Sequence, residues 1–159
     1  MRTVYIGLGS NLGEPVCQLE NAIAALKVLP LTTLQKRSSF YKSAPVGPQD
    51  QPDFVNAVIE LETQLSPLAL LDQLQAIEQA HRRVRARHWG PRTLDLDMLW
   101  CSDATMHTRR LILPHPEMHR RAFVLEPLSE LAPDLLIGEW SVKHLAMTLN
   151  DQPIDKLLE

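Results

Sequence analysis

The chain has few cysteines, and this shortage excludes several kinds of fold and site. Among its 159 residues only Cys17 and Cys101 are cysteines, and they lack Cys-x-x-Cys spacing. A disulfide framework and a thiolate zinc site are therefore excluded, and a reducing, cytoplasmic compartment is favoured. Histidines do not replace the thiolates, because the six histidines do not show the spacing of a zinc site, and the pair His115 and His119 straddles Pro116 at a turn.

Long apolar runs and a strong net charge are also missing. Gly7 and Gly9 interrupt the apolar N-terminal run and no stretch is long enough to cross a bilayer, so we expect neither a signal peptide nor a membrane partner. The formal net charge of -3 argues against nucleic acid as a partner. A composition of 45% hydrophobic and 22% charged residues predicts one globular domain over residues 1–159, which we expect to be a monomer.

Hydrophobic patterns predict the order strand, helix, strand, strand, helix, strand, then an added strand and C-terminal helices. Strands are expected over 3–8, 31–42, 54–63, 94–99 and 107–113, with helices beginning near Pro15, Ser66 and Ser141. Residues 9–13 and 45–52 are expected to be loops, and Pro127 is expected to break the apolar segment 123–131. This order is that of a ferredoxin-like βαββαβ core, so we predict an α+β fold, a three-layer αβα sandwich.

An arginine-rich segment leads directly into the strand 94–99, which carries two carboxylates. Because side chains alternate along a strand, Asp95 and Asp97 point to one face. Two like charges so close are unfavourable without cations, and their hard oxygens suit Mg²⁺, which takes further ligands from substrate phosphates. An isolated Asp-x-Asp is more often a solvated strand face, and other glycosyl- and nucleotidyl-transferring enzymes also use such pairs.

The surrounding arginines favour a phosphate ligand. Nine of the sixteen basic residues lie between 82 and 121, where lysine is absent: Arg82, Arg83, Arg85, Arg87, Arg92, Arg109, Arg110, Arg120 and Arg121. Arginine binds phosphate oxygens in pairs and keeps its charge, whereas a merely solvated surface would also include lysine. We therefore favour a phosphate site over a solvated helix end or an RNA-binding patch. His115, held between two prolines, has either a structural role or donates to a phosphate.

A second candidate site lies on the strand 54–63. Phe54 and Asn56 share one face of this strand, beside the proline-rich loop 45–52. An aromatic ring and an amide side chain together suit a flat heterocycle, because the ring stacks and the amide both donates and accepts hydrogen bonds. Core packing of Phe54 is the alternative.

Short blocks spaced along the chain carry a resemblance to a known family. They are 88–99 (HWGPRTLDLDML), 9–13 (GSNLG), 40–41 (FY), 47–52 (GPQDQP), 54–57 (FVNA) and 114–116 (PHP). Because these blocks follow one another along the chain in the order typical of the family, the chain resembles the 6-hydroxymethyl-7,8-dihydropterin pyrophosphokinases of the folate pathway over essentially its whole length.

The resemblance implies a reaction. Pyrophosphate would pass from ATP to the 6-hydroxymethyl oxygen of the reduced pterin and AMP would be released, with two Mg²⁺ ions held between Asp95 and Asp97. The alternatives are another Mg²⁺-dependent kinase or nucleotidyltransferase, and a non-catalytic nucleotide- or RNA-binding module.

The resemblance also implies roles for individual residues. The catalytic residues would be Arg83, Arg92, Asp95 and Asp97, although the spacing leaves Arg82 as a competitor of Arg83. ATP would contact Gln75, Glu78, Arg85, Trp89, Met98, Arg110, His115 and Arg121. The pterin would lie between Phe54 and Phe123 and would also contact Ser43, Ala44, Val46 and Asn56. Loops 45–52 and 82–91 are predicted to close over the substrates, with Trp89 as a lid.

The sequence also departs from the family pattern outside the two aspartates. Ala44 stands where relatives have proline, Pro116 where an aromatic residue can occur, and Ile112 where a hydroxyl group can assist ATP.

Overall fold

The computed structural model describes residues 1–11, 13–44, 52–85 and 94–157, without the side chains of 82–85. Its elements follow in the order β1 (Arg2–Ser10), α1 (Pro15–Lys27), β2 (Thr32–Arg37), β3 (Tyr41–Ser43), β4 (Phe54–Thr63), α2 (Pro67–Arg85), β5 (Leu94–Cys101), β6 (Met106–His107), β7 (Ile112–Leu113), the short 3-10 helix η1 (Met118–Arg120), α3 (Ala122–Leu131), β8 (Leu136–Ile137), β9 (Trp140–Ser141), α4 (Val142–Met147) and β10 (Ile154–Lys156).

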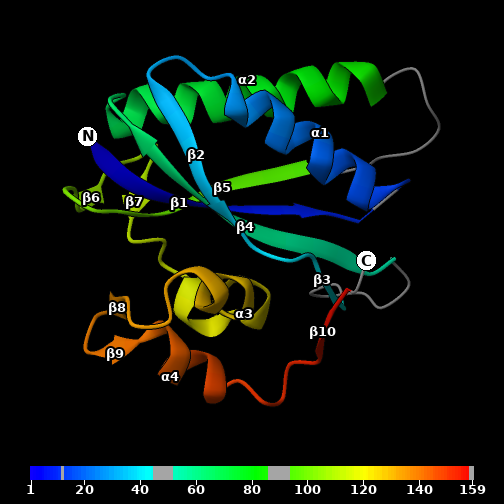
Figure 1. Ribbon diagram of the computed structural model, residues 1–159, viewed down its shortest axis with the longest axis vertical. Coiled ribbons are helices and arrows are strands. Elements are labelled where there is room, and N and C mark those ends of the chain that lie inside the picture. Colours follow the sequence, from blue (N-terminus) through cyan, green and yellow to red (C-terminus); the bar gives the residue numbers. More distant parts are fainter. Residues whose placement is uncertain (12, 45–51, 86–93, 158–159) are drawn as a thin grey trace.

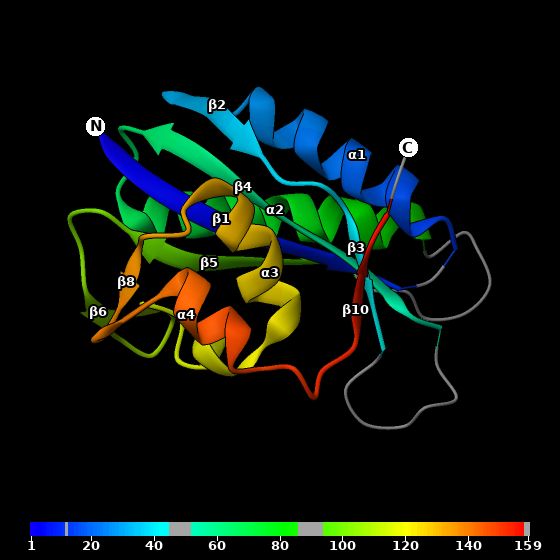
Figure 2. The same ribbon diagram turned by 60° about the horizontal axis from the view of Figure 1, so that its bottom comes forward.

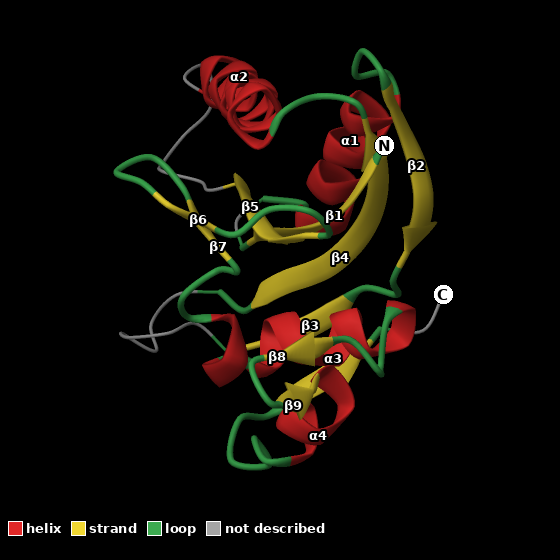
Figure 3. Cartoon of the chain, turned by 90° about the vertical axis from the view of Figure 1, so that its left-hand side faces the viewer, coloured by secondary structure: helices red, strands yellow, loops and turns green. Residues whose placement is uncertain are grey.

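The main sheet has six antiparallel strands, with β4 and β1 at its centre. The strand order is β10-β3-β4-β1-β5, and β2 pairs with the other half of β4. Helices α1 and α2 cover one face, while α3 and α4 cover the other (Figures 1 and 3). The predicted α+β sandwich with a ferredoxin-like core is confirmed. The C-terminal β10 runs beside β3 and adds an edge strand that the sequence did not predict (Figure 2).

The predicted alternation along the strands is confirmed, and it separates two apolar cores. On β4, Val55, Ala57, Ile59 and Leu61 pack with residues of α1 and α2, whereas Val58 packs with residues of α3 and α4. On β5 the same rule places Leu94, Leu96 and Met98 beneath α1 and α2, and Leu99 beneath α3. The side chains between these apolar residues are thereby directed to defined faces of the sheet.

The single strand predicted over 31–42 is wrong, because the chain breaks between β2 and β3. Ser38 is buried and binds one residue of the neighbouring strand twice. Its amide donates to the Val58 carbonyl at 2.9 Å, and its Oγ accepts from the Val58 amide at 2.9 Å. A serine hydroxyl replaces a backbone acceptor here, which ends the regular ladder without leaving a buried amide unpaired.

The strand predicted over 107–113 is a hairpin of β6 and β7. Thr108 forms its turn, since its amide donates to the Leu111 carbonyl at 2.9 Å and its Oγ1 accepts from the Leu111 amide at 3.1 Å. Hydroxyl groups that bind neighbouring backbone groups in this way favour turns over strands.

The predicted break at Pro127 is also wrong, because α3 runs through it. A proline removes one helical hydrogen bond, but buried Val124, Leu125 and Leu128 anchor both halves of α3 to the sheet.

The predicted helix starts are confirmed. The Ser66 Oγ accepts from the Ala69 amide at 3.2 Å, and that of Ser141 from the His144 amide at 3.1 Å.

Within the described ranges, none of the helices has the length and apolar character needed to span a membrane. Both cysteines are free thiols, Cys17 at the surface and Cys101 buried.

Candidate active site

A cavity of about 300 Å³ lies between the sheet and the N-terminal end of α3. It forms where β1 and β3 end and where β4 and β5 begin, so the antiparallel order brings four segments of the chain together. Its lining comprises Gly7, Leu8, Gly9, Ser43, Ala44, Phe54, Asn56, Ala57, Asp95, Asp97, Leu99, Arg121, Phe123 and Val124. Both candidate sites of the sequence therefore belong to one cavity.

Strand register places the polar groups of the cavity in rows across the sheet. Gly9 pairs with Asn56 on one side and with Asp95 on the other, so these residues form one row. Gly7 pairs with Asp97 in the next row on the same face. The amide side chain and the first carboxylate are therefore separated only by a residue that has no side chain.

One end of the cavity presents an aromatic and amide-bearing surface. Asn56 is 3% exposed, and its Nδ2 donates to the Ser43 Oγ at 2.7 Å. The half-buried Phe54 lies on the same strand face, and Phe123 lines the cavity from α3. This hydrogen bond fixes the orientation of the Asn56 amide, with its Oδ1 next to Gly9. Such a surface suits a flat ligand that has both donors and acceptors at its edge.

The other end of the cavity is acidic. Asp95 and Asp97 are exposed side chains of β5 and both line the cavity. Within the described part of the chain, no cluster of three or more His, Cys, Asp or Glu residues is placed to hold a metal ion. The donor set is therefore two carboxylates, which fits Mg²⁺, because this ion takes one or two protein carboxylates and completes its shell with water and phosphate.

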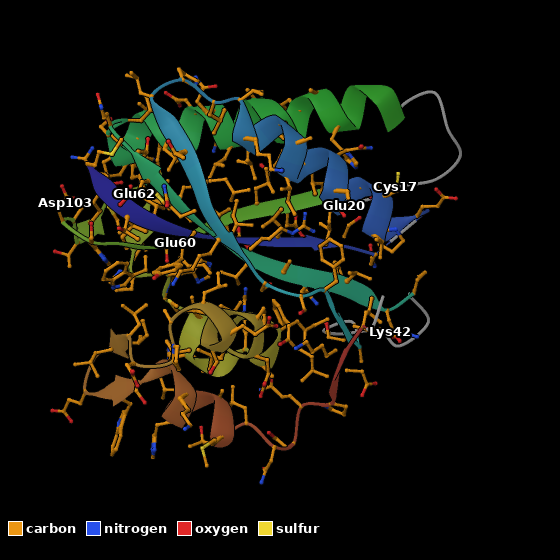
Figure 4. The ribbon with its side chains drawn as sticks, viewed as in Figure 1. Cys17, Glu20, Lys42, Glu60, Glu62 and Asp103 are labelled. Atoms are coloured by element: carbon orange, nitrogen blue, oxygen red, sulfur yellow. The ribbon has the colours of Figure 1, made fainter. Side chains whose placement is uncertain are left out.

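The acids on the far side of the molecule differ from this pair. Glu62 and Asp103 lie at the opposite end of the sheet (Figure 4). Asp103 accepts a 3.0 Å bond from Arg2, and Glu62 accepts a 3.4 Å bond from Gln35. These two acids form hydrogen bonds and an ion pair at the surface, whereas Asp95 and Asp97 face a cavity.

Arg121 provides positive charge at the edge of the cavity. It is the residue before α3, and its Cζ lies 5.6 Å from the centre of the Phe123 ring. A guanidinium over an aromatic face is attracted to that face and keeps its donors directed outward. Arg121 and Phe123 thus line the cavity as a pair on the side that faces the sheet.

His115 is half-buried and is not among the residues that line the cavity, but it interacts electrostatically with Asp97 and Arg121, which are. Its amide donates to the Leu99 carbonyl at 2.8 Å, and its Nδ1 accepts from the Glu117 amide at 3.0 Å. The neutral ring therefore carries its proton on Nε2. Burial lowers the pKa of His115 below the ordinary 6.5; Asp97 and Glu117 oppose this shift, and Arg121 adds to it. The ring is thus a neutral Nε2–H donor at neutral pH.

Several residues expected to contact ATP lie outside this cavity. The Glu78 Oε2 accepts from the Leu96 amide at 2.9 Å, and Arg110 Nη2 donates to the Gln75 Oε1 at 3.1 Å and to Asp72 at 2.6 Å. Gln75, Glu78 and Arg110 thus gather where α2 meets the edge strand β5. Met98 is 3% exposed, on the opposite face of β5 from Asp97.

Several expected site residues lie outside the described residues. These are Val46, Trp89 and Arg92, together with the loop 45–51 and most of the second predicted lid, so their roles stay predictions. Arg83 and Arg85 belong to the last turn of α2, whose side chains are not described. The choice between Arg82 and Arg83 likewise stays open.

Gly7 and Gly9 line the cavity but are not among the residues predicted from the sequence. The first strand is expected to end at Leu8, with Gly9 in a turn, but β1 continues to Ser10. The available signal was two glycines at alternate positions of an otherwise apolar strand, a pattern that marks close approach by another group.

Comparisons with known proteins show the family of the chain. A sequence model of the family 7,8-dihydro-6-hydroxymethylpterin-pyrophosphokinase (HPPK) matches residues 5–133. The 2-amino-4-hydroxy-6-hydroxymethyldihydropteridine pyrophosphokinase of Haemophilus influenzae is 56% identical over 137 residues, which cover 86% of each chain. The protein of the same name from Pseudomonas aeruginosa is 49% identical over 155 residues, 98% of this chain and 94% of the relative.

Solved structures share the fold at much lower identity. The crystal structure of Plasmodium falciparum HPPK-DHPS wild type with SDX-DHP superposes with a TM-score of 0.72 at 14% identity, over 93% of this chain and 43% of that one. A structure of HPPK-DHPS in complex with substrates gives 0.73 at 12% identity, over 95% and 46%. This chain therefore spans less than half the length of those chains. By the family match and the close relatives, the chain belongs to the 7,8-dihydro-6-hydroxymethylpterin-pyrophosphokinase family.

Proposed function

We propose that the chain uses its cavity to transfer pyrophosphate from ATP to the 6-hydroxymethyl oxygen of 6-hydroxymethyl-7,8-dihydropterin. The products are AMP and the pterin diphosphate, an intermediate of folate biosynthesis. The chain is thus an ATP-dependent pyrophosphokinase, as its family membership indicates. The observation that supports the use of this cavity is the presence of an aromatic and amide surface and an acid pair within one space of about 300 Å³.

The pterin occupies the aromatic end in this proposal. Phe54 and Phe123 stack on the two faces of the ring, while Asn56 and Ser43 bind its polar edge. Ala44, and Val46 outside the described residues, contribute backbone groups. The Asn56–Ser43 hydrogen bond supports this assignment, because it fixes which amide atoms remain for a ligand.

The acid pair organises the phosphates. Asp95 and Asp97 would hold two Mg²⁺ ions, which would supply neutralisation of the phosphate charge when bound. The two carboxylates thus place the phosphates of ATP at the acidic end of the cavity, next to the end that binds the pterin. Their exposure to the cavity and their shared strand face support this role.

Cationic and neutral donors complete the polyphosphate site. Arg121, in the lining of the cavity, and the Nε2–H of His115 position the triphosphate. Arg83, Arg85, Arg92 and Arg110 are assigned to the triphosphate from the sequence. Trp89 covers the bound nucleotide. Gln75, Glu78 and Met98 define the adenine end near α2 and β5. Because His115 is neutral at pH 7, it donates to a phosphate oxygen and leaves the compensation of phosphate charge to the arginines and metal.

We further propose that residues 1–159 act as one domain, a cytoplasmic monomer. Both apolar cores share the strands of one sheet, and both thiols are free, which supports this proposal. Sedimentation at micromolar concentration tests it, and a dimer would contradict it.

A product assay tests the proposed reaction. The protein is supplied with ATP, Mg²⁺ and 6-hydroxymethyl-7,8-dihydropterin, and the nucleotide and pterin products are separated. AMP and pterin diphosphate in equal amounts are expected. ADP would indicate an ordinary kinase, and an absence of turnover would indicate a binding module.

A further inference from the structure

Gly9 lies at the centre of the row that connects the two halves of the cavity. Its partners in register are Asn56 on β4 and Asp95 on β5. Neighbouring strands are about 4.8 Å apart, so the backbones of Asn56 and Asp95 are separated by roughly 10 Å, with only Gly9 between them. A bicyclic heterocycle with a one-carbon arm is close to this length.

The backbone conformation of Gly9 does not require glycine. The glycines with positive φ in the described residues are Gly13 and Gly138, and Gly9 belongs to the extended strand β1. Gly9 is required instead because a side chain at this position has little space. A Cβ atom at this position would lie 3.1 Å from the Asn56 Oδ1 and 3.8 Å from Cδ1 of Phe54.

Asn56 has little freedom to move away from such an atom. Its side chain is 3% exposed, and its Nδ2 is engaged with Ser43 at 2.7 Å. A methyl group on Gly9 would therefore rotate the amide or break this hydrogen bond, and either change alters the groups that Asn56 presents to the cavity.

Gly7, two residues earlier, provides a contrast on the same strand. The three atoms nearest to a Cβ there all belong to the side chain of Leu99, at 3.4 to 3.7 Å, which is ordinary van der Waals contact. Both glycines line the cavity, but the nearest atom to an added Cβ is a polar one at Gly9 and an apolar one at Gly7.

We infer that Gly9 is a specificity-determining residue: its bare backbone keeps the Asn56 amide in its binding orientation, at the end of the row along which a flat bicyclic substrate extends its arm from Asn56 to the acid pair. This inference rests on the proposed function, because it assigns the heterocycle to the Asn56 end and the reacting hydroxyl to the Asp95 end.

Steady-state kinetics of Gly9→Ala and Gly7→Ala test this role, with pterin and ATP varied separately. Gly9→Ala is expected to raise the KM for 6-hydroxymethyl-7,8-dihydropterin at least tenfold and to leave the KM for ATP within twofold. Gly7→Ala is expected to change the pterin KM by a smaller factor. The side-chain amide resonances of Asn56 should shift in Gly9→Ala and not in Gly7→Ala, a difference that general destabilisation would not produce.

The double variant Gly9→Ala/Asn56→Ala tests the mechanism, because it removes the atom that the new methyl group would meet. Its pterin KM should equal that of Asn56→Ala alone within twofold. A further tenfold loss, or a double variant that does not fold, would overturn the assignment, as would equal pterin KM values for Gly9→Ala and Gly7→Ala. If the wild-type protein makes no AMP and no pterin diphosphate, the proposed reaction itself fails.

Discussion

The two faces of the main sheet are built from the same strands but differ in what they bury. The face beneath α1 and α2 is apolar along β4 and β5, where every second residue enters one core. The face beneath α3 and α4 has an apolar core only over part of its area, and the remainder holds Asn56, Asp95 and Asp97 around a cavity. Substitutions beneath α1 and α2 are therefore expected to change mainly stability, whereas substitutions around the cavity are expected to change mainly ligand binding and turnover.

The largest expected effect on the cavity face is that of Asp97→Ala on turnover. We expect kcat to fall by about a thousandfold or more, about 4 kcal/mol, because organisation of the metal and phosphates is lost. The pterin affinity should fall much less. Thermal unfolding should change little, since Asp97 is exposed. A near-normal rate of AMP release would contradict the metal assignment.

The largest effect on the other face should be on stability. Leu74→Ala removes a side chain of α2 that is 0% exposed and should lower the free energy of unfolding by about 2 to 5 kcal/mol. Well below the melting temperature, kcat should stay close to the wild-type value. Leu68→Ala is the matched control, because Leu68 lies on the same helix and is 37% exposed. Equal losses of stability in a urea titration would show that the apolar core has been misplaced.

A smaller effect is expected at Glu130 of α3, on the cavity side of the sheet. Its carboxylate accepts from the Ser39 amide at 3.1 Å, from the Ser39 hydroxyl at 3.1 Å and from the Tyr41 hydroxyl. These bonds connect the helix that carries Phe123 to β3, which carries Ser43. Glu130→Ala should therefore cost roughly 1 to 3 kcal/mol of stability and raise the KM for the pterin more than that for ATP.

Glu126→Ala removes the same charge one helical turn earlier and is the control for Glu130. A pterin KM that rises equally in both variants would show that charge, rather than the connection to β3, is responsible.

The smallest expected effect is the pH dependence due to His115. Because burial lowers its pKa in the folded state, the unfolded chain binds the proton first as pH falls below 6.5. Stability should therefore decrease with falling pH from about 6.5 to the folded pKa, and His115→Gln should remove this slope. Since Asp97 raises the pKa of His115, Asp97→Asn should lower it further in an NMR titration. A pKa at or above 6.5 would contradict the assignment.

Local sequence patterns predicted much of the difference between the two faces of the sheet. They missed the features that depend on contacts between residues distant in the sequence. Alternation in β4 and β5 assigned Asn56, Asp95 and Asp97 to their faces, because the direction of a side chain in a strand follows from the backbone alone. The break at Ser38 was missed because it depends on Val58, and helix α3 continues through Pro127 because of its packing on the sheet.

The candidate site shows the same limit. Of the described residues that the sequence predicted for the site, the structure places eight in the lining of the cavity: Ser43, Ala44, Phe54, Asn56, Asp95, Asp97, Arg121 and Phe123. Gly9 was missed because its importance appears only when strand register places it between Asn56 and Asp95.

The central claim is that the face beneath α3 binds the pterin and the phosphates together. The most direct measurement is a crystal structure of the protein with 6-hydroxymethylpterin, a non-hydrolysable ATP analogue and Mg²⁺. We predict that the heterocycle lies between Phe54 and Phe123 and extends across Gly9, with Mg²⁺ bound by Asp95 and Asp97. A heterocycle bound elsewhere, or metal ions that contact neither aspartate, would contradict this account.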